Sequence, residues 1–537
     1  DVPRIPSAVV LAVLSVTLVV ALASPPNTYD SHTYHLARVM HWIQNASVSD
    51  YPTAILRQLY QPPLAEYAIM HLQVLSGSDR FANIVQWISL IGTAAAVSSI
   101  AYEVGLGRRS QAFAAALTVT VPSAIVQATG TQNDVVAAFF VVSFFLFFLR
   151  SVNGRGSDWI WTGAALGMAL MTKSTTFLYC FPIGLFFAVT GFLIADHRAD
   201  RLLLVRRVAF ILIVAAAFNF GHFARNYSLF GSPVSSGDDE VRNRRINASI
   251  IGANLTRNFA MNLGTGITSV DEAVERSIRK VLGKEISNPD STWMENEFDV
   301  RFSTHEDLAG NLLHVILLTA AIGIAAFFAR RERGPFGIIG IIFSMVVGIV
   351  LFAILLKWQL WTARLQLPLF SLGTVLVAFA AERVSLRGMI PITLVCFVFA
   401  MPFMLAGEPR RLISMGERRG VFSEQRTPKL YKNLPDLGPL YAGAAGFIRQ
   451  RKNPPTTVGI AIEFNDFEYP IWELLKDDPT GAPLIRHIGV TNASKALKPE
   501  GPAPDLVIAT RTGNVFDGIS YREVWKNDVV RVLEPFR

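Results

Sequence analysis

Long apolar runs recur through the first three quarters of this chain of 537 residues. About 20 apolar residues span the hydrocarbon of a bilayer as a helix, which satisfies its own backbone hydrogen bonds there. We expect about 11 transmembrane helices, near residues 6–24, 82–104, 110–128, 134–150, 158–173, 176–195, 204–222, 309–329, 335–356, 366–381 and 389–406. With 51% hydrophobic and 17% charged residues, the composition fits a polytopic membrane protein of mainly α-helical fold.

Basic residues mark alternate short connections between these runs. They occur at Arg4, at Arg108 and Arg109, at Arg150 and Arg155, from Arg198 to Arg207, from Arg330 to Arg333, and at Arg383 and Arg387. Positive charge in short loops is retained on the cytoplasmic side, so we expect a cytoplasmic N-terminus in a bacterial inner (plasma) membrane. The net charge of +8 lies mainly in these clusters, which set topology, so we expect no nucleic-acid binding.

Three long segments then lie on the opposite, periplasmic side: residues 25–81, residues 223–308 and the tail. The chain divides into a transmembrane module, residues 1–406, and a C-terminal domain, residues 407–537. In the tail the apolar runs shorten to TTVGIAIE, APLIRHIGV and APDLVIAT, with turn residues and the helix-like EYPIWELLKD between them. This pattern predicts a small soluble α/β domain with a supporting or acceptor-binding role.

The segment after the first span combines amphipathic helices with charged residues. Residues 31–45 place His35, Val39 and Trp42 on one stripe, which predicts a helix in the membrane interface. A second helix is expected after the proline pair of YQPPLAEYAIMHLQVL, because proline is tolerated in the first helical turn. We expect this first outer loop to form a shelf that presents Asp30 at the membrane surface.

Several polar motifs follow one another at the outer ends of the predicted spans. They are Asp30 after the first span, the QPPL segment, Asp134 in TQNDVV and Lys173 in GMALMTKSTTF. In this order they resemble the GT-C fold glycosyltransferases that use polyprenyl-phosphate sugars, in the branch of the protein O-mannosyltransferases and lipid A aminoarabinose transferases. The resemblance covers roughly the first 230 residues and, more loosely, KWQLWTARLQLPLF at 357–370. It implies a GT-C fold and sugar transfer.

Two positions depart from the pattern of that family. Many relatives carry an acidic pair after the first span, where this chain has Asp30 followed by Ser31. They often carry Lys or His before the proline pair, where this chain has Gln61. The departures keep Asp30 as the catalytic candidate and leave the sugar and the acceptor open.

The chemistry needs a base for the acceptor hydroxyl and positive charge on the phosphate, which is already a good leaving group. The resemblance points to Asp30 as the base, and we expect desolvation at the mouth of a span to raise its basicity. Lys173, Arg225 and Arg364 are candidates for binding the donor phosphate. The competing interpretations are an Asp30 helix cap, a snorkelling Lys173 and arginines that anchor lipid headgroups.

Other polar residues are candidates for contact with the acceptor or with a metal. These are Asp134, which also suits the N-cap of the fourth span, His35 and Gln61. In THEDLAGN, His305, Glu306 and Asp307 offer metal ligands, with a solvated cap on the next helix as the competing interpretation. The reaction requires no cofactor, and a divalent metal is compatible with it.

The sequence therefore predicts a membrane glycosyltransferase that moves a sugar, with inversion, from a polyprenyl-phosphate donor to a lipid, glycan or protein acceptor at the periplasmic face. A polyprenyl-diphosphate glycan ligase or polymerase is one alternative, because arginine-rich outer loops suit it too. A lipid or glycan transporter is another. A transporter is expected to carry ionisable residues near the bilayer midplane, whereas here they gather at the outer ends of spans.

Overall fold

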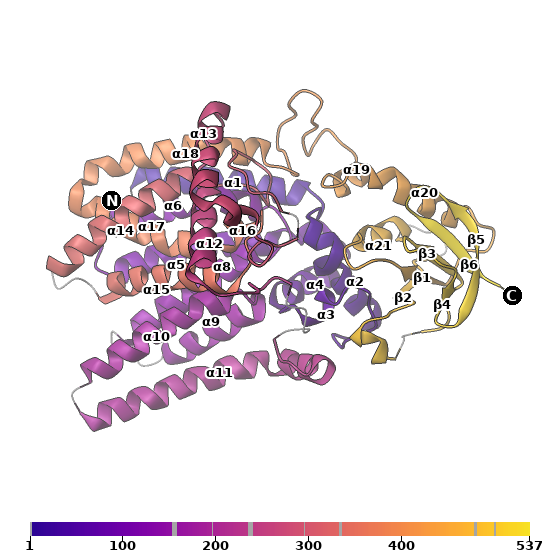
Figure 1. The fold of residues 1–537 in the computed structure, drawn as a ribbon, viewed down its shortest axis with the longest axis horizontal. Helices are drawn as coiled ribbons and strands as arrows, with labels where there is room; N and C mark the ends of the chain where they lie inside the picture. Colours follow the sequence, from indigo (N-terminus) through magenta and orange to yellow (C-terminus); the bar gives the residue numbers. More distant parts are fainter. Residues whose placement is uncertain are drawn as a thin grey trace.

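A bundle of apolar helices and a small sheet domain lie end to end along the longest axis of the molecule (Figure 1). The computed structural model describes residues 3–152, 158–195, 197–234, 240–294, 296–331, 336–476, 481–498 and 501–536. The N-terminus lies in the bundle, away from the sheet domain, and the C-terminus lies at the far edge of the sheet domain. We call the bundle end that faces the sheet domain the outer end.

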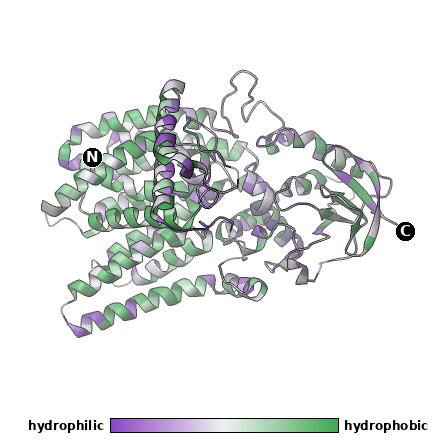
Figure 2. Cartoon of the chain, viewed as in Figure 1, coloured by the Kyte–Doolittle hydropathy of each residue, from purple (hydrophilic) through white to green (hydrophobic). Residues whose placement is uncertain are grey.

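Eight helical segments of the described residues are long and apolar enough to cross a membrane. Hydrophobic residues dominate these helices in Figure 2. Their helices are α1 (Arg4–Ala23), α5 (Ile84–Glu103), α8 (Asp134–Val152), α10 (Thr176–Ile194), α11 (Arg198–Phe230), α15 (Phe336–Leu355), α17 (Leu367–Val384) and α18 (Met389–Ala406).

The other three predicted runs are also helical but shorter. The run at 110–128 is divided into α6 (Arg108–Val119) and α7 (Pro122–Gln127), because Pro122 cannot continue the preceding helix. Helix α9 (Asp158–Thr172) has 15 residues, and the apolar part of α14 (Leu312–Arg331) ends at Phe328. Two of the basic residues used to predict orientation, Arg155 and Arg333, lie outside the described residues.

Glycines bring α9 and α11 into close contact. A Cβ atom on Gly163 would lie 2.8 Å from Val214 Cβ, and one on Gly167 would lie 3.1 Å from Ala215 Cα. Asn219 of α11 donates a hydrogen bond of 2.9 Å to the Gly167 carbonyl. Small residues allow such close packing where lipid provides no hydrophobic driving force. The contact supports the helix that carries Lys173 at its outer end.

The outer segments contain the helices predicted for the first loop and several others. The first outer loop contains η1 (Ser31–His35), α2 (Leu36–Asn45), α3 (Arg57–Tyr60), α4 (Leu64–Ser76) and η2 (Asp79–Phe81). The second contains α12 (Ala248–Ala260), α13 (Thr268–Leu282) and η3 (Gly283–Ser287). Helices α2, α3 and α4 lie between the bundle and the sheet domain (Figure 1). Gln44 of α2 exchanges two hydrogen bonds with the Ile485 backbone, so the first outer loop supports the sheet domain.

The sheet domain has six strands in the order β2-β1-β3-β6-β5-β4. The three predicted runs form β1 (Thr457–Ala461), β2 (Leu484–His487) and β3 (Leu506–Ala509), and β1 pairs in parallel with both neighbours. An antiparallel part follows with β4 (Val515–Phe516), β5 (Ile519–Lys526) and β6 (Arg531–Pro535). The domain also contains α19 (Arg426–Leu430), α20 (Leu437–Arg449), α21 (Tyr469–Leu475) and η5 (Ala493–Ala496). EYPIWELLKD contains α21, as predicted.

Candidate active site

Arg364 lies at the centre of a charged cluster at the outer end of the bundle. It belongs to α16 (Thr362–Leu365), immediately before α17, and its side chain is only 7% exposed. Its Nη2 lies 2.8 Å from Asp30 Oδ2, its Nε 3.3 Å from Asp307 Oδ1 and its Nη1 3.6 Å from Asp134 Oδ2. Its Nη1 also donates a hydrogen bond to Gln132 Oε1. One guanidinium thus contacts three carboxylates that come from distant parts of the chain.

A short network of hydroxyl groups positions Asp30. The Ser31 amide donates to Thr28 Oγ1 at 3.0 Å, and the Ser31 hydroxyl lies 2.5 Å from Thr28 Oγ1 and 2.5 Å from Thr131 Oγ1. Ser31, which stands where many relatives have a second acid, therefore ties the start of η1 to the segment just before α8. The widened π-helical turn that follows is a feature often found at functional sites.

Lys173 follows the last residue of α9 and faces the same cluster. Its Nζ lies 2.5 Å from Asp134 Oδ1, and Asp134 is the first residue of α8. Asn133 donates a hydrogen bond of 2.9 Å to the Thr172 carbonyl and joins the ends of the two helices. Lys173 and Arg364 therefore share the Asp134 carboxylate and form one cationic pair.

The electrostatics of Asp30 differ from the expectation that desolvation raises its basicity. Burial does raise its pKa, but Arg364, His35 and Arg57 outweigh this effect and lower the pKa to about 2. Burial disfavours the charge of Arg364, yet its three carboxylate partners raise its pKa well above the usual value. Burial also raises the pKa of Asp307, against the attraction of Arg364. In this arrangement Asp30 is ionised and is a weak base.

A second charged group lies beside the first, within the first outer loop. His35 Nδ1 is hydrogen-bonded to Glu66 Oε1, and Arg38 Nη2 donates to the same oxygen at 2.7 Å. Burial raises the pKa of Glu66, but Arg38 and His35 lower it to about 2. Arg38 also donates a hydrogen bond of 2.8 Å to the backbone carbonyl of Gln61. The other carboxylate oxygen, Glu66 Oε2, is buried without a hydrogen-bond partner within the described parts of the chain, which marks it as an acceptor for a bound group.

Three other predicted site residues contact different partners. Arg225 donates a hydrogen bond of 3.2 Å to the Tyr67 hydroxyl and lies 3.7 Å from Asp50, beside the first outer loop. His305 Nε2 lies 2.9 Å from Asn433 Oδ1. Glu306 is fully buried and forms an ion pair of 2.5 Å with Arg410. His305 and Glu306 thus hold the segment that leads to the sheet domain, and neither contacts Arg364.

Among the described residues, His41, Glu468 and His487 form the one group of three metal-capable side chains within reach of a common ion. Glu468 accepts four hydrogen bonds, from His41 Nε2, His487 Nε2, Gln58 Nε2 and Trp472 Nε1. The Ala54 amide donates to His487 Nδ1, which places the proton of neutral His487 on Nε2, facing the carboxylate. These contacts fit a hydrogen-bonded joint between the first outer loop and the sheet domain better than a metal site, and we call it the Glu468 hub.

Residues 60–221 match the family model of the dolichyl-phosphate-mannose-protein mannosyltransferases. The crystal structure of ArnT from Cupriavidus metallidurans bound to undecaprenyl phosphate has 15% identity and a TM-score of 0.57, and the match covers 98% of this chain and 97% of that chain. For the Archaeoglobus fulgidus oligosaccharyltransferase in complex with Zn and sulfate, the identity is 13%, the TM-score 0.50 and the coverage 94% of this chain and 68% of that chain. A search of curated proteins finds no match.

These comparisons define the chain as a polytopic membrane protein with the GT-C fold. They confirm the resemblance to the GT-C glycosyltransferases in the branch of the protein O-mannosyltransferases and aminoarabinose transferases. They also confirm the prediction of a mainly helical chain with a small C-terminal α/β domain.

Two polar residues of the cluster and its surroundings were not among the predicted site residues: Gln132 and Glu66. Gln132 lies two residues before Asp134, in the same TQNDVV motif. Asp307 was predicted as a metal ligand with His305 and Glu306, whereas the structure places it 3.3 Å from Arg364. Glu66 is a buried acid in the mainly apolar helix α4. Because acids are rarely buried without a partner, its position in the sequence could have indicated a site residue.

Proposed function

We propose that this protein is a membrane glycosyltransferase that moves a sugar from a polyprenyl-phosphate donor to an acceptor at the outer end of the bundle, with inversion at the anomeric carbon. The observation that carries the proposal is the convergence of Asp30 with Arg364 and Lys173 at the outer ends of GT-C helices. The similar ArnT structure is bound to undecaprenyl phosphate, which supports the class of donor.

The two cations suit the donor phosphate. A guanidinium can bind two phosphate oxygens at once, and an ammonium group adds a second point of positive charge. Both side chains now contact carboxylates. We infer that the donor phosphate replaces some of these contacts, so that Arg364 exchanges Asp30 for phosphate oxygens. The cations then stabilise the charge that grows on the phosphate as the glycosidic bond breaks.

This exchange would also activate Asp30. Arg364 is the strongest of the interactions that lower the Asp30 pKa, and burial acts in the opposite direction. Once Arg364 turns to the phosphate, burial raises the basicity of Asp30 toward the range a general base needs. Asp30 takes the proton of the acceptor hydroxyl, and the acceptor oxygen attacks the anomeric carbon. The bond between that carbon and the phosphate oxygen breaks, and polyprenyl phosphate leaves with the electron pair.

The location of the reaction follows from the charge of the loops. Basic residues at the opposite bundle end favour a cytoplasmic N-terminus, which puts the cluster and the C-terminal domain on the periplasmic face of an inner membrane. The acceptor is a lipid, glycan or protein hydroxyl on that face. The proposed steps need no metal, so we expect activity to persist in EDTA.

The test is sugar transfer by the purified full chain in nanodiscs, with a panel of polyprenyl-monophosphate sugars, matched diphosphate-linked glycans and cell extract as the source of acceptor. We expect turnover with one monophosphate donor and a loss of about 10²–10⁴-fold in kcat for Asp30→Asn, with a donor Kd that is unchanged or lower because one carboxylate no longer competes for Arg364. Asp50→Asn, in the same outer loop but outside the cluster, is the matched control.

Two results would overturn the proposal. Full kcat in Asp30→Asn would remove Asp30 as the base. Turnover confined to diphosphate-linked donors would favour the ligase or polymerase alternative, and donor movement across the membrane without cleavage would favour a transporter.

A further inference from the structure

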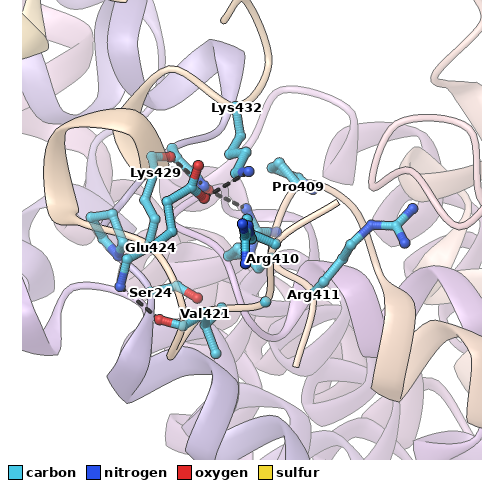
Figure 3. Close-up of a pocket in the computed structure, with 12 residues that line it drawn as sticks. Ser24, Pro409, Arg410, Arg411, Val421, Glu424, Lys429 and Lys432 are labelled. Atoms are coloured by element: carbon cyan, nitrogen blue, oxygen red, sulfur yellow. Dashed lines mark hydrogen bonds and ion pairs between the residues drawn. The ribbon is translucent and has the colours of Figure 1, made fainter. Parts of the chain in front are cut away.

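A basic hollow lies beside the outer end of α1, where the chain leaves the bundle for the sheet domain (Figure 3). The hollow is small and partly open to solvent. Its charged lining residues are Arg410, Arg411, Arg419, Lys429, Lys432 and Glu424. Five cations and a single acid therefore face one small space, which we call the outer basic hollow.

Acidic partners neutralise three of these cations. Arg410 is buried and pairs with Glu306, and Arg411 hydrogen-bonds Glu408. Lys432 Nζ lies 2.7 Å from Glu424 Oε2. These ion pairs fix the wall of the hollow and leave two of its cations without an ion-pair partner among the described residues.

The other two cations are Lys429 and Arg419. Lys429 donates hydrogen bonds to two carbonyl oxygens, Val421 O at 2.7 Å and Ala23 O at 3.4 Å, which are dipoles and not anions. Arg419 is exposed, and no carboxylate lies within ion-pair distance of it in the described parts of the chain. An anion in the hollow would thus meet two positive charges that carry no carboxylate partner.

A buried hydroxyl points to a ligand independently of the charges. Ser24 lines the hollow and is 4% exposed, and its Oγ has no hydrogen-bond partner within the described residues. A buried polar atom without a partner costs about 1–3 kcal/mol, so such atoms are rare unless a water or a bound group completes them. Ser24 directly follows α1 and lines the same hollow as Arg410 (Figure 3).

We propose that the outer basic hollow binds a phosphate group, distinct from the donor phosphate at Arg364. A phosphate oxygen accepts hydrogen bonds from a guanidinium, an ammonium and a hydroxyl, which are the groups gathered here. The hollow lies at the end of a membrane-spanning helix, the level at which lipid headgroups are found. The phosphate belongs either to a lipid headgroup or to a soluble phosphate, and the chemistry of the site is the same for both.

A short segment of the chain, from Asn27 to Asp30, connects the hollow with the candidate active site. Asn27, which also lines the hollow, accepts a hydrogen bond of 2.8 Å from Arg410 and precedes Asp30 by three residues. An occupant of the hollow therefore contacts the segment that positions Asp30. The inference does not rest on glycosyl transfer, because it concerns binding and is measured without a sugar donor.

The test is binding to the purified full chain in nanodiscs without donor. One arm titrates inorganic phosphate by calorimetry, and the other compares retention of phosphatidic acid with that of phosphatidylcholine by native mass spectrometry. We expect the phosphate Kd to rise about tenfold in Arg419→Gln/Lys429→Met and about threefold in Ser24→Ala, which removes only the hydroxyl. Arg418→Gln is the matched control, because the neighbouring Arg418 hydrogen-bonds Glu408 and does not line the hollow.

The variant Lys173→Met separates the two phosphate sites. We expect it to keep phosphate binding in the hollow, and retention of phosphatidic acid that falls with Arg419→Gln/Lys429→Met would assign the ligand to a lipid. Binding of inorganic phosphate alone would assign it to a soluble phosphate. Loss of binding in Lys173→Met with no effect of Ser24→Ala or Arg419→Gln/Lys429→Met would place the phosphate at the active site and overturn the inference, as would absence of binding in both arms.

Discussion

Replacing Glu468 by glutamine tests whether the sheet domain holds the first outer loop in place. Glu468 is fully buried, and each of its oxygens accepts two hydrogen bonds. Glutamine has the same shape but offers one oxygen, so its amide group faces two donors. At ~1–3 kcal/mol for each orphaned buried donor, Glu468→Gln should destabilise the joint by about 2–6 kcal/mol.

The assay is hydrogen exchange of the full chain in nanodiscs, followed by mass spectrometry. Exchange should accelerate at least about 30-fold in residues 31–45 and 469–475, which meet at the hub, and stay unchanged in the bundle. The control is Glu463→Gln, because the Glu463 side chain is 61% exposed and should cost less than about 0.5 kcal/mol. Wild-type protection of both segments in Glu468→Gln would refute the reasoning.

Three further predictions concern other elements. Burial lowers the pKa of His32 to about 4, so between this value and the usual histidine pKa only the unfolded chain takes up a proton. The free energy of unfolding should therefore fall by about 1.4 kcal/mol between about pH 8 and pH 5.5. Thermal melting of His32→Gln should depend less on pH. Arg364→Lys cannot reproduce the guanidinium contacts, so donor affinity measured by calorimetry should fall about tenfold or more. In Gly264→Ala the new Cβ would lie 2.1 Å from the Arg301 carbonyl oxygen, so hydrogen exchange in the second outer loop should increase.

Local sequence patterns predicted most of the elements. Apolar runs located the membrane helices because the bilayer leaves few alternatives to a helix. The break at Pro122 was not predicted, although proline removes a backbone donor and its ring prevents the preceding helix from continuing. The short apolar runs of the tail predicted β1 to β3, whereas the more polar strand β5 was missed. Its exposed residues match the solvent-facing side of an antiparallel sheet.

The candidate active site is formed by contacts between residues that are far apart in the sequence, and local sequence patterns do not predict such contacts. Arg364 and Asp30 are 334 positions apart, and Glu468 and His41 are 427 apart. The consequence is clearest for Asp30. Burial alone raises its pKa, and the net lowering depends on a cation 2.8 Å away that only tertiary packing provides.

The charges of the active-site cluster lead to a final prediction about donor binding. Three carboxylates, Asp30, Asp134 and Asp307, face two cations, Arg364 and Lys173, so the cluster carries one excess negative charge when all are ionised. A sugar phosphodiester is also an anion, and the two should repel each other unless one carboxylate takes up a proton. Asp307 is suited to this role, because burial raises its pKa, whereas Arg364 lowers the pKa of Asp30 to about 2 before the donor binds, so Asp30 starts ionised.

Binding of the donor should therefore be coupled to proton uptake by Asp307, so that affinity rises as the pH falls toward the raised pKa of Asp307. Asp307→Asn removes both the charge and the titration, and it should bind the donor more tightly at high pH with a flatter pH profile. Calorimetric titration of the nanodisc-embedded chain at several pH values measures both effects. A donor affinity that is independent of pH in the wild type, or an equally steep profile in Asp307→Asn, would show that the donor binds without proton uptake by Asp307.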